Sequence, residues 1–184
     1  MPILAEARKK PLDEWSIHAY ETAVAHLNGV PVKKEKEVVA KSLLKGKELE
    51  LFNAGKVIYG KEGYCTTCHQ ADGKGLTASG FPPLTANKWV LGSEDRLIKL
   101  ALKGLLGPIE VSGKKYPGQV PMTPFGGLLN DEEMAAVLTY VRNSFGNQGS
   151  AILPERVKKV RAATESKQDF YSPDQLLKEH PMEK

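Results

Sequence analysis

The sequence predicts an all-α protein with one folded unit and an extension at each end. Amphipathic segments with a 3.6-residue period recur along the chain, and the stretches between them are rich in glycine and proline. The 184 residues are enough for one domain with additions, and no run approaches the ~20 apolar residues that a membrane-spanning helix needs. These observations favour a small helical domain over a sheet protein or a membrane protein.

Changes in composition divide the chain into three segments. Residues 1–44 are an N-terminal extension with one amphipathic segment, Trp15 to Leu27, followed by a charged linker. Residues 45–149 are the folded unit, and residues 150–184 are a C-terminal extension. Apolar stripes along Trp15–Leu27 and the pair Phe170-Tyr171 would be costly to leave in water, so we expect both extensions to dock rather than hang free.

Helix periodicity and helix caps locate the individual elements. Ser93 and the pair Asn130/Glu133 are N-cap signals, and Gly60 and Gly104 are stop signals. Five helices are expected in residues 45–184, spanning 47–59, 94–103, 131–145, 155–163 and 172–178. Residues 70–92 are expected to be loop, and the segments 109–111 and 115–116 to pair as a small hairpin around Ser112-Gly113.

Charge and cysteine content exclude several classes of protein. The net charge of +4 divides as +1, +2 and +1 over the three segments, which argues against a nucleic-acid binder with a concentrated basic face. Only two cysteines are present, Cys65 and Cys68, so a disulfide scaffold is excluded.

The two cysteines belong to a motif with a specific chemistry. Cys65-Thr66-Thr67-Cys68-His69 is C-x-x-C-H, the attachment signal of c-type haem. Two thiols on one short turn can reach the two vinyl groups on one edge of a porphyrin, and the next residue then presents an imidazole to the iron. The motif predicts one covalently bound haem with His69 as the proximal ligand.

Two other uses of a C-x-x-C pair are weaker here. A structural zinc site needs four nitrogen or sulfur ligands, but the other histidines lie in the extensions and no second cysteine pair exists. A thioredoxin-like redox motif belongs to a βαβ unit, which this pattern of helices and Gly/Pro-rich loops does not resemble.

The second axial ligand follows by elimination among histidines and methionines. His18, His26 and His180 belong to the extensions, and Met134 lies on the apolar stripe of the last helix of the folded unit. Met122 lies in the loop Val120-Pro121-Met122-Thr123-Pro124-Phe125, where two prolines stiffen a non-helical backbone around a thioether. We therefore expect Met122 to bind the iron opposite His69.

Because these motifs occur in this order along the chain, residues 45–149 resemble a class I cytochrome c domain. The matching pieces are Gly55-x-x-x-Tyr59, the C-x-x-C-H motif, Phe81-Pro82-Pro83-Leu84, the Pro-Met-Thr-Pro loop and Leu138-Thr139-Tyr140-Val141. The resemblance implies a cytochrome c-like helical fold around one haem, with the first and last helices of the domain crossing closely at Gly55. Residues 45–149 are also similar to haem modules that are attached to bacterial dehydrogenases.

The resemblance also implies residues around the ligands. A proline carbonyl at Pro82 or Pro83 would accept the Nδ1–H of His69, which orients a ligand imidazole and raises its basicity. Trp89 would contact a haem propionate through its indole N–H or else simply pack in the core, and Tyr116 has the same two alternatives.

Ligation by His69 and Met122 predicts electron transfer rather than catalysis. Both axial positions would be filled, and His/Met ligands raise the reduction potential. The expected function is one-electron transfer by a protein that is not itself an enzyme. One alternative is the haem domain or subunit of a larger oxidoreductase, and another is a catalytic or gas-sensing haem with a labile Met122.

Partners and compartment follow from the same chemistry. The expected partner is a redox protein, either an oxidoreductase or an oxidase. We expect no binding to nucleic acid. Covalent haem attachment takes place outside the cytoplasm, so we expect a periplasmic or otherwise extracytoplasmic location in a bacterium, although residues 1–10 lack the apolar run of a signal peptide. The sequence does not indicate an oligomeric state.

Overall fold

The described part of the chain, residues 44–182, is helical with one small hairpin. This structure is a computed structural model, and the N-terminal segment Trp15–Leu27 lies outside the described residues. The elements in chain order are α3 (Lys47–Tyr59), α4 (Cys65–His69), the 3-10 turn η2 (Thr77–Ser79), α5 (Lys88–Leu91), α6 (Glu94–Lys103), β1 (Ile109–Val111), β2 (Lys114–Tyr116), α7 (Asp131–Asn143), α8 (Pro154–Ala163) and α9 (Pro173–Glu179). None of these helices is long and apolar enough to cross a membrane.

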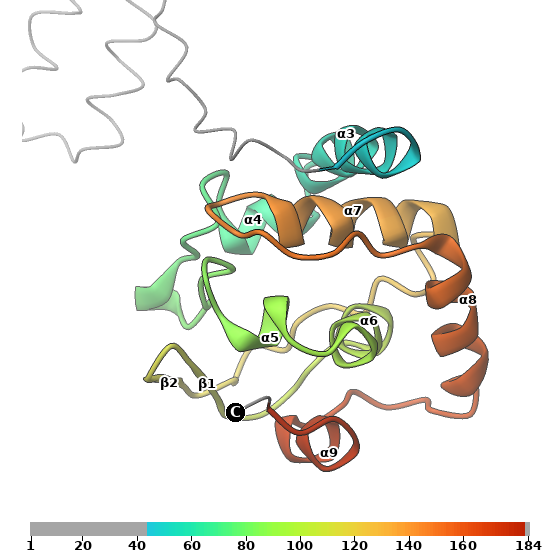
Figure 1. The fold of residues 1–184 in the computed structure, drawn as a ribbon. Coiled ribbons are helices and arrows are strands. Elements are labelled where there is room, and N and C mark those ends of the chain that lie inside the picture. Colours follow the sequence, from blue (N-terminus) through green and yellow to red (C-terminus); the bar gives the residue numbers. More distant parts are fainter. Residues whose placement is uncertain (1–43, 183–184) are drawn as a thin grey trace, which may run out of the picture. The chain divides into compact units, whose positions relative to one another are not determined.

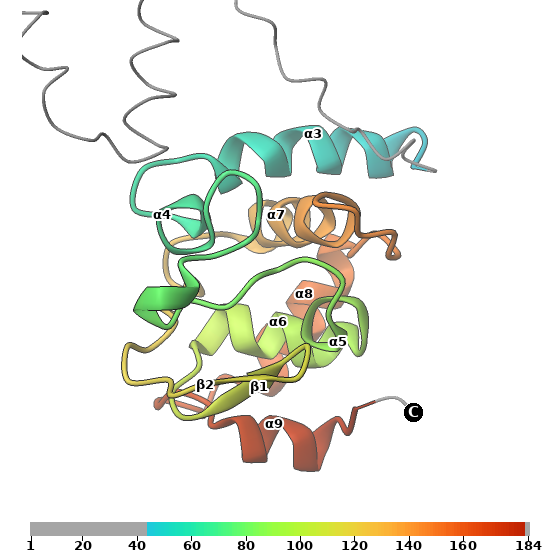
Figure 2. The ribbon, with the colours of Figure 1, turned by 90° about the vertical axis from the view of Figure 1, so that its left-hand side faces the viewer.

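The helices of residues 44–182 are stacked in levels. In both ribbon views α3 lies against α7, α6 lies on the other side of α7, and α9 lies beyond α6 (Figures 1 and 2). Figure 1 shows α8 descending along one side, from the level of α7 toward the level of α9. The C-terminal extension therefore returns along the domain and covers its lower face in this view.

The close crossing of α3 and α7 depends on Gly55. A Cβ atom added to Gly55 would overlap the backbone carbonyl of Ala136 and would come within 2.8 Å of the Tyr140 Cβ. The expectation that a small residue here lets the two helices approach is confirmed. Phe52 and Tyr59 then pack their rings on Tyr140, with centroids 5.2 and 5.3 Å apart.

Local signals explain the helix boundaries. The side chains of Ser93 and Asn130 accept backbone N–H bonds at the starts of α6 and α7, and Asn130 with Glu133 forms the predicted capping box. Ser112 and Gly113 both have positive φ, 51° and 78°, as a tight two-residue hairpin turn requires.

The stretch 70–92 is more ordered than the loop we expected. It contains η2 and the short helix α5, whose start is capped by the Asn87 side chain accepting from the Val90 N–H. Asn147 also reaches back from beyond α7 to donate to the Leu84 carbonyl at 2.9 Å. A four-residue helix, preceded by a loop that a distant asparagine holds, leaves no periodic signal in the sequence.

Apolar side chains form two clusters, and the C-terminal extension contributes to both. The first cluster joins α3, α6 and α7 and includes Ile152 and Val157 from the extension. The second surrounds Trp89 and includes Tyr171 and Leu176 from the extension. The part of the extension that the structure describes is therefore docked, as the pair Phe170-Tyr171 predicts.

One buried arginine holds the chain near its C-terminal end. Arg96 is fully buried and donates to the carbonyls of His180 and Pro181 at 2.8 and 2.9 Å, while its guanidinium lies 5.5 Å from the Trp89 ring centroid. These bonds to a charged donor are stronger than neutral ones. They tie the residues after α9 to α6.

Candidate functional site

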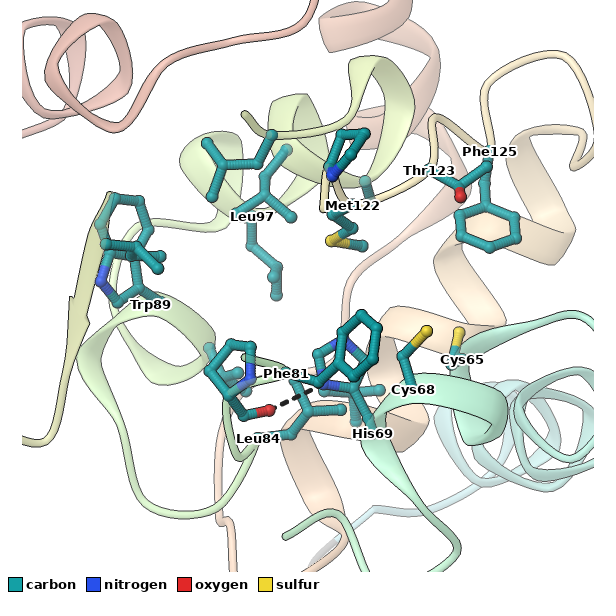
Figure 3. A pocket seen from close by; sticks show the side chains of 18 of the residues that line it. Cys65, Cys68, His69, Phe81, Leu84, Trp89, Leu97, Met122, Thr123 and Phe125 are labelled. Carbon is teal, nitrogen blue, oxygen red and sulfur yellow. Dashed lines mark hydrogen bonds between the residues drawn. The ribbon is translucent and has the colours of Figure 1, made fainter. Parts of the chain in front are cut away.

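Helix α4 places the two thiols of the motif on one side of a cavity. Cys65 and Cys68 are three residues apart on a single helical turn, so their side chains leave the same face. Figure 3 shows both sulfur atoms at one end of the cavity, next to His69. Burial raises the pKa of the Cys65 thiol to about 11, which keeps it protonated at neutral pH.

The ring of His69 is oriented by a backbone carbonyl. Its Nδ1–H donates to the Pro82 oxygen at 2.9 Å, so Nε2 carries the lone pair that a metal needs. Burial lowers the pKa of His69, which favours the neutral imidazole, although the bond to Pro82 acts in the opposite direction. A partly buried, neutral, oriented imidazole is suited to bind iron.

The chain leaves α4 through a strained residue that α3 supports. Gln70 has φ 62°, in the left-handed region that non-glycine residues rarely adopt. The Tyr59 hydroxyl donates to the Gln70 carbonyl at 2.6 Å. This bond fixes the end of α4 against α3 and so fixes the position of His69.

Met122 lies across the cavity from His69. Its segment pairs antiparallel with Leu105, exchanging two backbone bonds of 2.9 and 3.3 Å. Figure 3 shows the Met122 side chain entering the cavity from the wall opposite His69, with its sulfur toward the interior. The structure therefore brings the four residues expected to hold the cofactor around one space.

That space is an apolar cavity of about 350 Å³. Its wall is made mainly by side chains of α6, α7 and the loops that precede them, among them Leu84, Leu97, Leu100, Phe125, Leu138 and Val141. The helical members of this wall also lie on the apolar stripes of α6 and α7, which a 3.6-residue period marks as core faces. The apolar period marks a buried face, but it does not indicate whether that face meets protein or a cofactor.

Three other residues expected near the cofactor differ in their placement. Pro83 lines the cavity, but its carbonyl accepts from the Asn87 side chain, and Pro82 is the partner of His69. Trp89 also lines the cavity, yet its indole N–H donates to the Glu110 carbonyl at 2.9 Å instead of facing the interior. Of the two alternatives for Trp89, packing against the core is the one the structure supports.

Tyr116 lies outside the cavity wall. It is buried in the second cluster, where β2 packs against Trp89, and the Lys114 ammonium lies 5.4 Å from its ring centroid. Of its two alternatives, packing in the core is the one that its burial favours. An aromatic residue in a short hairpin gives no periodic signal, so the sequence does not distinguish these positions.

Met134 also lies next to the cavity, but it belongs to a regular helix, unlike Met122. It is fully buried on α7 and contributes to the wall of the cavity. Its position within the regular helix matches the core role that its spacing predicts, whereas Met122 projects from an irregular segment. In the described residues 44–182, no group of three His, Cys, Asp or Glu side chains gathers as a site for a bare metal ion.

The donor set and the cavity fit a covalently attached haem. Two thiols on one turn, an oriented neutral imidazole and an opposing thioether are the groups that attach the porphyrin and fill both axial positions of its iron. The surrounding wall is apolar, and its volume is in the range of ~300–1,000 Å³ usual for ligand sites.

Comparison with known proteins gives the class to which this arrangement belongs. The family model described as "Cytochrome c" matches residues 52–145. Cytochrome c-552 of Thermus thermophilus is 38% identical over 107 residues, covering 53% of this chain and 79% of the relative. The chain therefore belongs to the cytochrome c family.

Subunits of dehydrogenases are also among its relatives. The cytochrome c subunit of an alcohol dehydrogenase (quinone) from Gluconobacter oxydans (strain 621H) is 31% identical over 112 residues, 59% of this chain but 22% of that protein. The fructose dehydrogenase cytochrome subunit of Gluconobacter japonicus is 33% identical over 115 residues and is covered to the same 22%. Both groups of relatives support electron transfer, and haem c is the cofactor of the family.

Proposed function

We propose that this chain holds one haem c through thioethers from Cys65 and Cys68, with His69 and Met122 as its axial ligands. The observation that carries the proposal is the cavity itself, with two thiols and an oriented imidazole on one side and a methionine sulfur on the other. When bound, the haem supplies an iron that changes charge by one electron.

The chain's own residues would attach and tune the group. Cys65 and Cys68 would each hold the group through a thioether, in which the thiol would have added across a vinyl group with its sulfur on one carbon and its proton on the neighbouring carbon. The Pro82 carbonyl, by accepting from Nδ1, increases the basicity of His69 at Nε2. A thioether on the opposite side raises the reduction potential, and the apolar wall excludes water from the interior.

This ligation favours a relay over a catalyst. If His69 and Met122 both bind the iron, no position would remain for dioxygen or a substrate, so the protein would pass single electrons and would catalyse no reaction itself. A catalytic or gas-sensing role would require Met122 to leave readily. The segment that carries Met122 does not favour such a role, since two backbone bonds hold it to Leu105.

A second candidate is a haem domain or subunit of a larger oxidoreductase. The relatives named as dehydrogenase cytochrome subunits support it, because this chain matches 22% of their length. In that case the partner is an oxidoreductase that delivers electrons, or an oxidase that takes them up. Covalent haem attachment places the protein outside the cytoplasm of a bacterium.

Intact mass and haem-stained denaturing gels test the cofactor. Because addition of thiols to vinyl groups loses no atoms, the mass should exceed that of the chain by one whole haem. Cys65→Ser together with Cys68→Ser should abolish the covalent stain, and the ferric wild type should show the weak near-infrared band of an iron–thioether bond. A colourless protein of unmodified mass, from a host competent for cytochrome maturation, would contradict the proposal.

A further inference from the structure

The Met122 segment is held on its outer side by the C-terminal extension. Leu105 lies between the two, bonded to Met122 on one edge. On its other edge, the Leu106 N–H donates to the Tyr171 carbonyl at 2.9 Å, and the Tyr171 N–H donates to the Gly104 carbonyl at 3.2 Å. Three chain segments far apart in sequence thus form one small ladder, with the methionine on its inner edge.

This ladder is tightly packed at Gly104. A Cβ atom there would overlap the Met122 carbonyl oxygen and would lie within 2.6 Å of the Phe170 ring, and the φ of 76° also requires glycine. Tyr171 and Leu176 complete the packing behind the ladder in the second apolar cluster, where Leu176 is fully buried. Gly104 therefore lies in close contact with both the Met122 carbonyl and the Phe170 ring of the extension.

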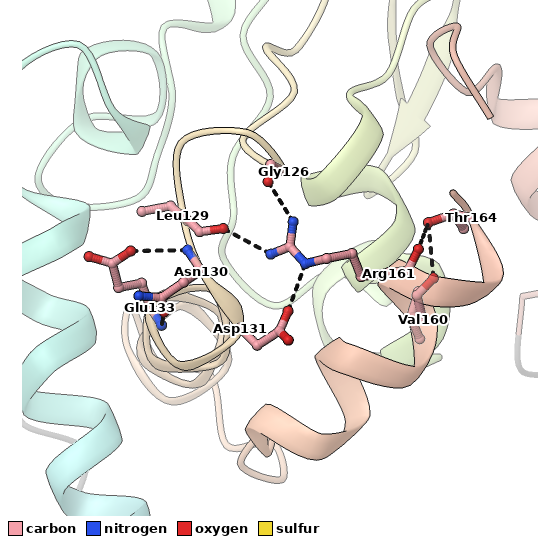
Figure 4. A network of polar contacts seen from close by, with 8 residues as sticks. All are labelled: Gly126, Leu129, Asn130, Asp131, Glu133, Val160, Arg161 and Thr164. Carbon is pink, nitrogen blue, oxygen red and sulfur yellow. Dashed lines mark hydrogen bonds and ion pairs between the residues drawn. The ribbon is translucent and has the colours of Figure 1, made fainter. Parts of the chain in front are cut away.

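The chain just after the methionine is held by a second part of the extension. Arg161 of α8 donates from Nη1 to the Gly126 carbonyl at 2.5 Å and from Nη2 to the Leu129 carbonyl at 2.8 Å (Figure 4). Its Nε donates to Asp131 at 2.7 Å. One planar guanidinium thus fixes three points of the turn that leads from the methionine segment into α7.

We propose that the C-terminal extension positions Met122 and so determines how readily the second axial position opens. This inference rests on the proposed ligation by Met122. For the sulfur to leave and another ligand to enter, the segment between Leu105 and Gly126 must open locally, and the free energy of that opening is set by the contacts that hold it. α8 holds one end of the segment and the residues around Tyr171 hold the other.

Two pairs of single substitutions in the full-length holoprotein test the proposal. Arg161→Ala removes the three bonds to the turn, while Arg156→Ala on the same helix removes a bond to Asp95 on α6, away from the turn. Leu176→Ala empties a buried site behind the ladder, while Ile152→Ala empties an equally buried site in the first cluster. Each pair truncates similar side chains of the C-terminal extension and differs in whether the lost contacts support the Met122 segment. The arginine pair differs as well in the number of bonds lost, three against one.

The measurement is the rate at which cyanide replaces the sixth ligand of the ferric protein, followed by loss of the near-infrared band. Arg161→Ala and Leu176→Ala should each raise this rate about tenfold or more, from the loss of charge-assisted bonds or of buried packing. Arg156→Ala and Ile152→Ala should change it less than about threefold, although Ile152→Ala should lower Tm about as much as Leu176→Ala, because both side chains are fully buried.

The outcomes separate this inference from the ligation on which it depends. If both members of each pair raise the rate equally, the extension only stabilises the fold and the inference is overturned. If wild type lacks the near-infrared band and binds cyanide as fast as Met122→Ala does, the ligation itself is wrong. Should Leu176→Ala fail to fold, the arginine pair decides alone.

Discussion

The two sides of the cavity are built in different ways. On the His69 side, the ligand and both thiols lie within five residues of one helical turn, and Pro82 and Tyr59 supply one bond each. On the Met122 side, the ligand lies on an irregular segment whose position depends on Leu105 and on α8. One side is fixed mainly by local sequence, and the other is assembled from residues far apart in the chain.

This difference determines which substitutions should disturb the ligand geometry on each side of the cavity. A local turn keeps its geometry while its neighbours move, so damage to the His69 side should require loss of the α3–α7 packing that supports it. An assembled segment loses its geometry when any one of its distant supports is removed. Substitutions on the two sides should therefore separate effects on folding from effects on ligation.

The largest expected effect comes from Gly55→Ala, which prevents α3 from lying on α7. The new Cβ meets a backbone carbonyl that cannot move aside, so the free energy of unfolding should fall by about 3 kcal/mol or more. Denaturant unfolding of the holoprotein measures it. Gly60→Ala is the matched control, since a Cβ there makes ordinary contact at 3.6 Å, and equal losses for both would refute the argument.

Met134→Ala and Met122→Ala should have opposite signatures. Met134 is fully buried in α7, so its truncation should cost about 2–5 kcal/mol while the near-infrared band survives. Met122→Ala should abolish that band and open the iron to cyanide, with a smaller loss of stability because its side chain is only partly buried. Loss of the band in Met134→Ala alone would reassign the ligand.

Tyr59→Phe should have the smallest effect and should act on the His69 side only. It removes the 2.6 Å bond to the Gln70 carbonyl while keeping the ring contacts with Tyr140 and Phe145. Loss of one such bond costs about 0.5–1.5 kcal/mol, visible as a lower midpoint in thermal unfolding. The rate of cyanide binding should stay at the wild-type value, and an increase would mean that the two sides are not independent.

The same contrast explains what the sequence could predict. Helices α3 and α6 have the predicted bounds, and α7 ends two residues earlier than expected, because caps and apolar periods are local properties. The motif at Cys65–His69 is equally local, so its side of the site could be recognised without a structure. Met122 could be singled out only because two prolines rule out a helix around it.

What the sequence could not predict depends on contacts between distant residues. The choice of Pro82 over Pro83 follows from where the loop after η2 meets His69, and Asn87 occupies the other carbonyl. Trp89 donates to a hairpin strand twenty-one residues later, and Tyr116 packs behind it. No spacing in the chain encodes such pairings.

The ladder of Met122, Leu105 and Tyr171 also bears on the order in which parts of the chain fold. Every residue proposed to hold the cofactor precedes residue 126 in the chain, whereas Arg161 and Tyr171, through which the C-terminal extension braces the methionine segment, come after residue 150. A chain that folds from its N-terminal part first would have its thiols and imidazole in place while the opposite wall is still unbraced. Docking of the last segment would then close the cavity behind a cofactor that is already attached.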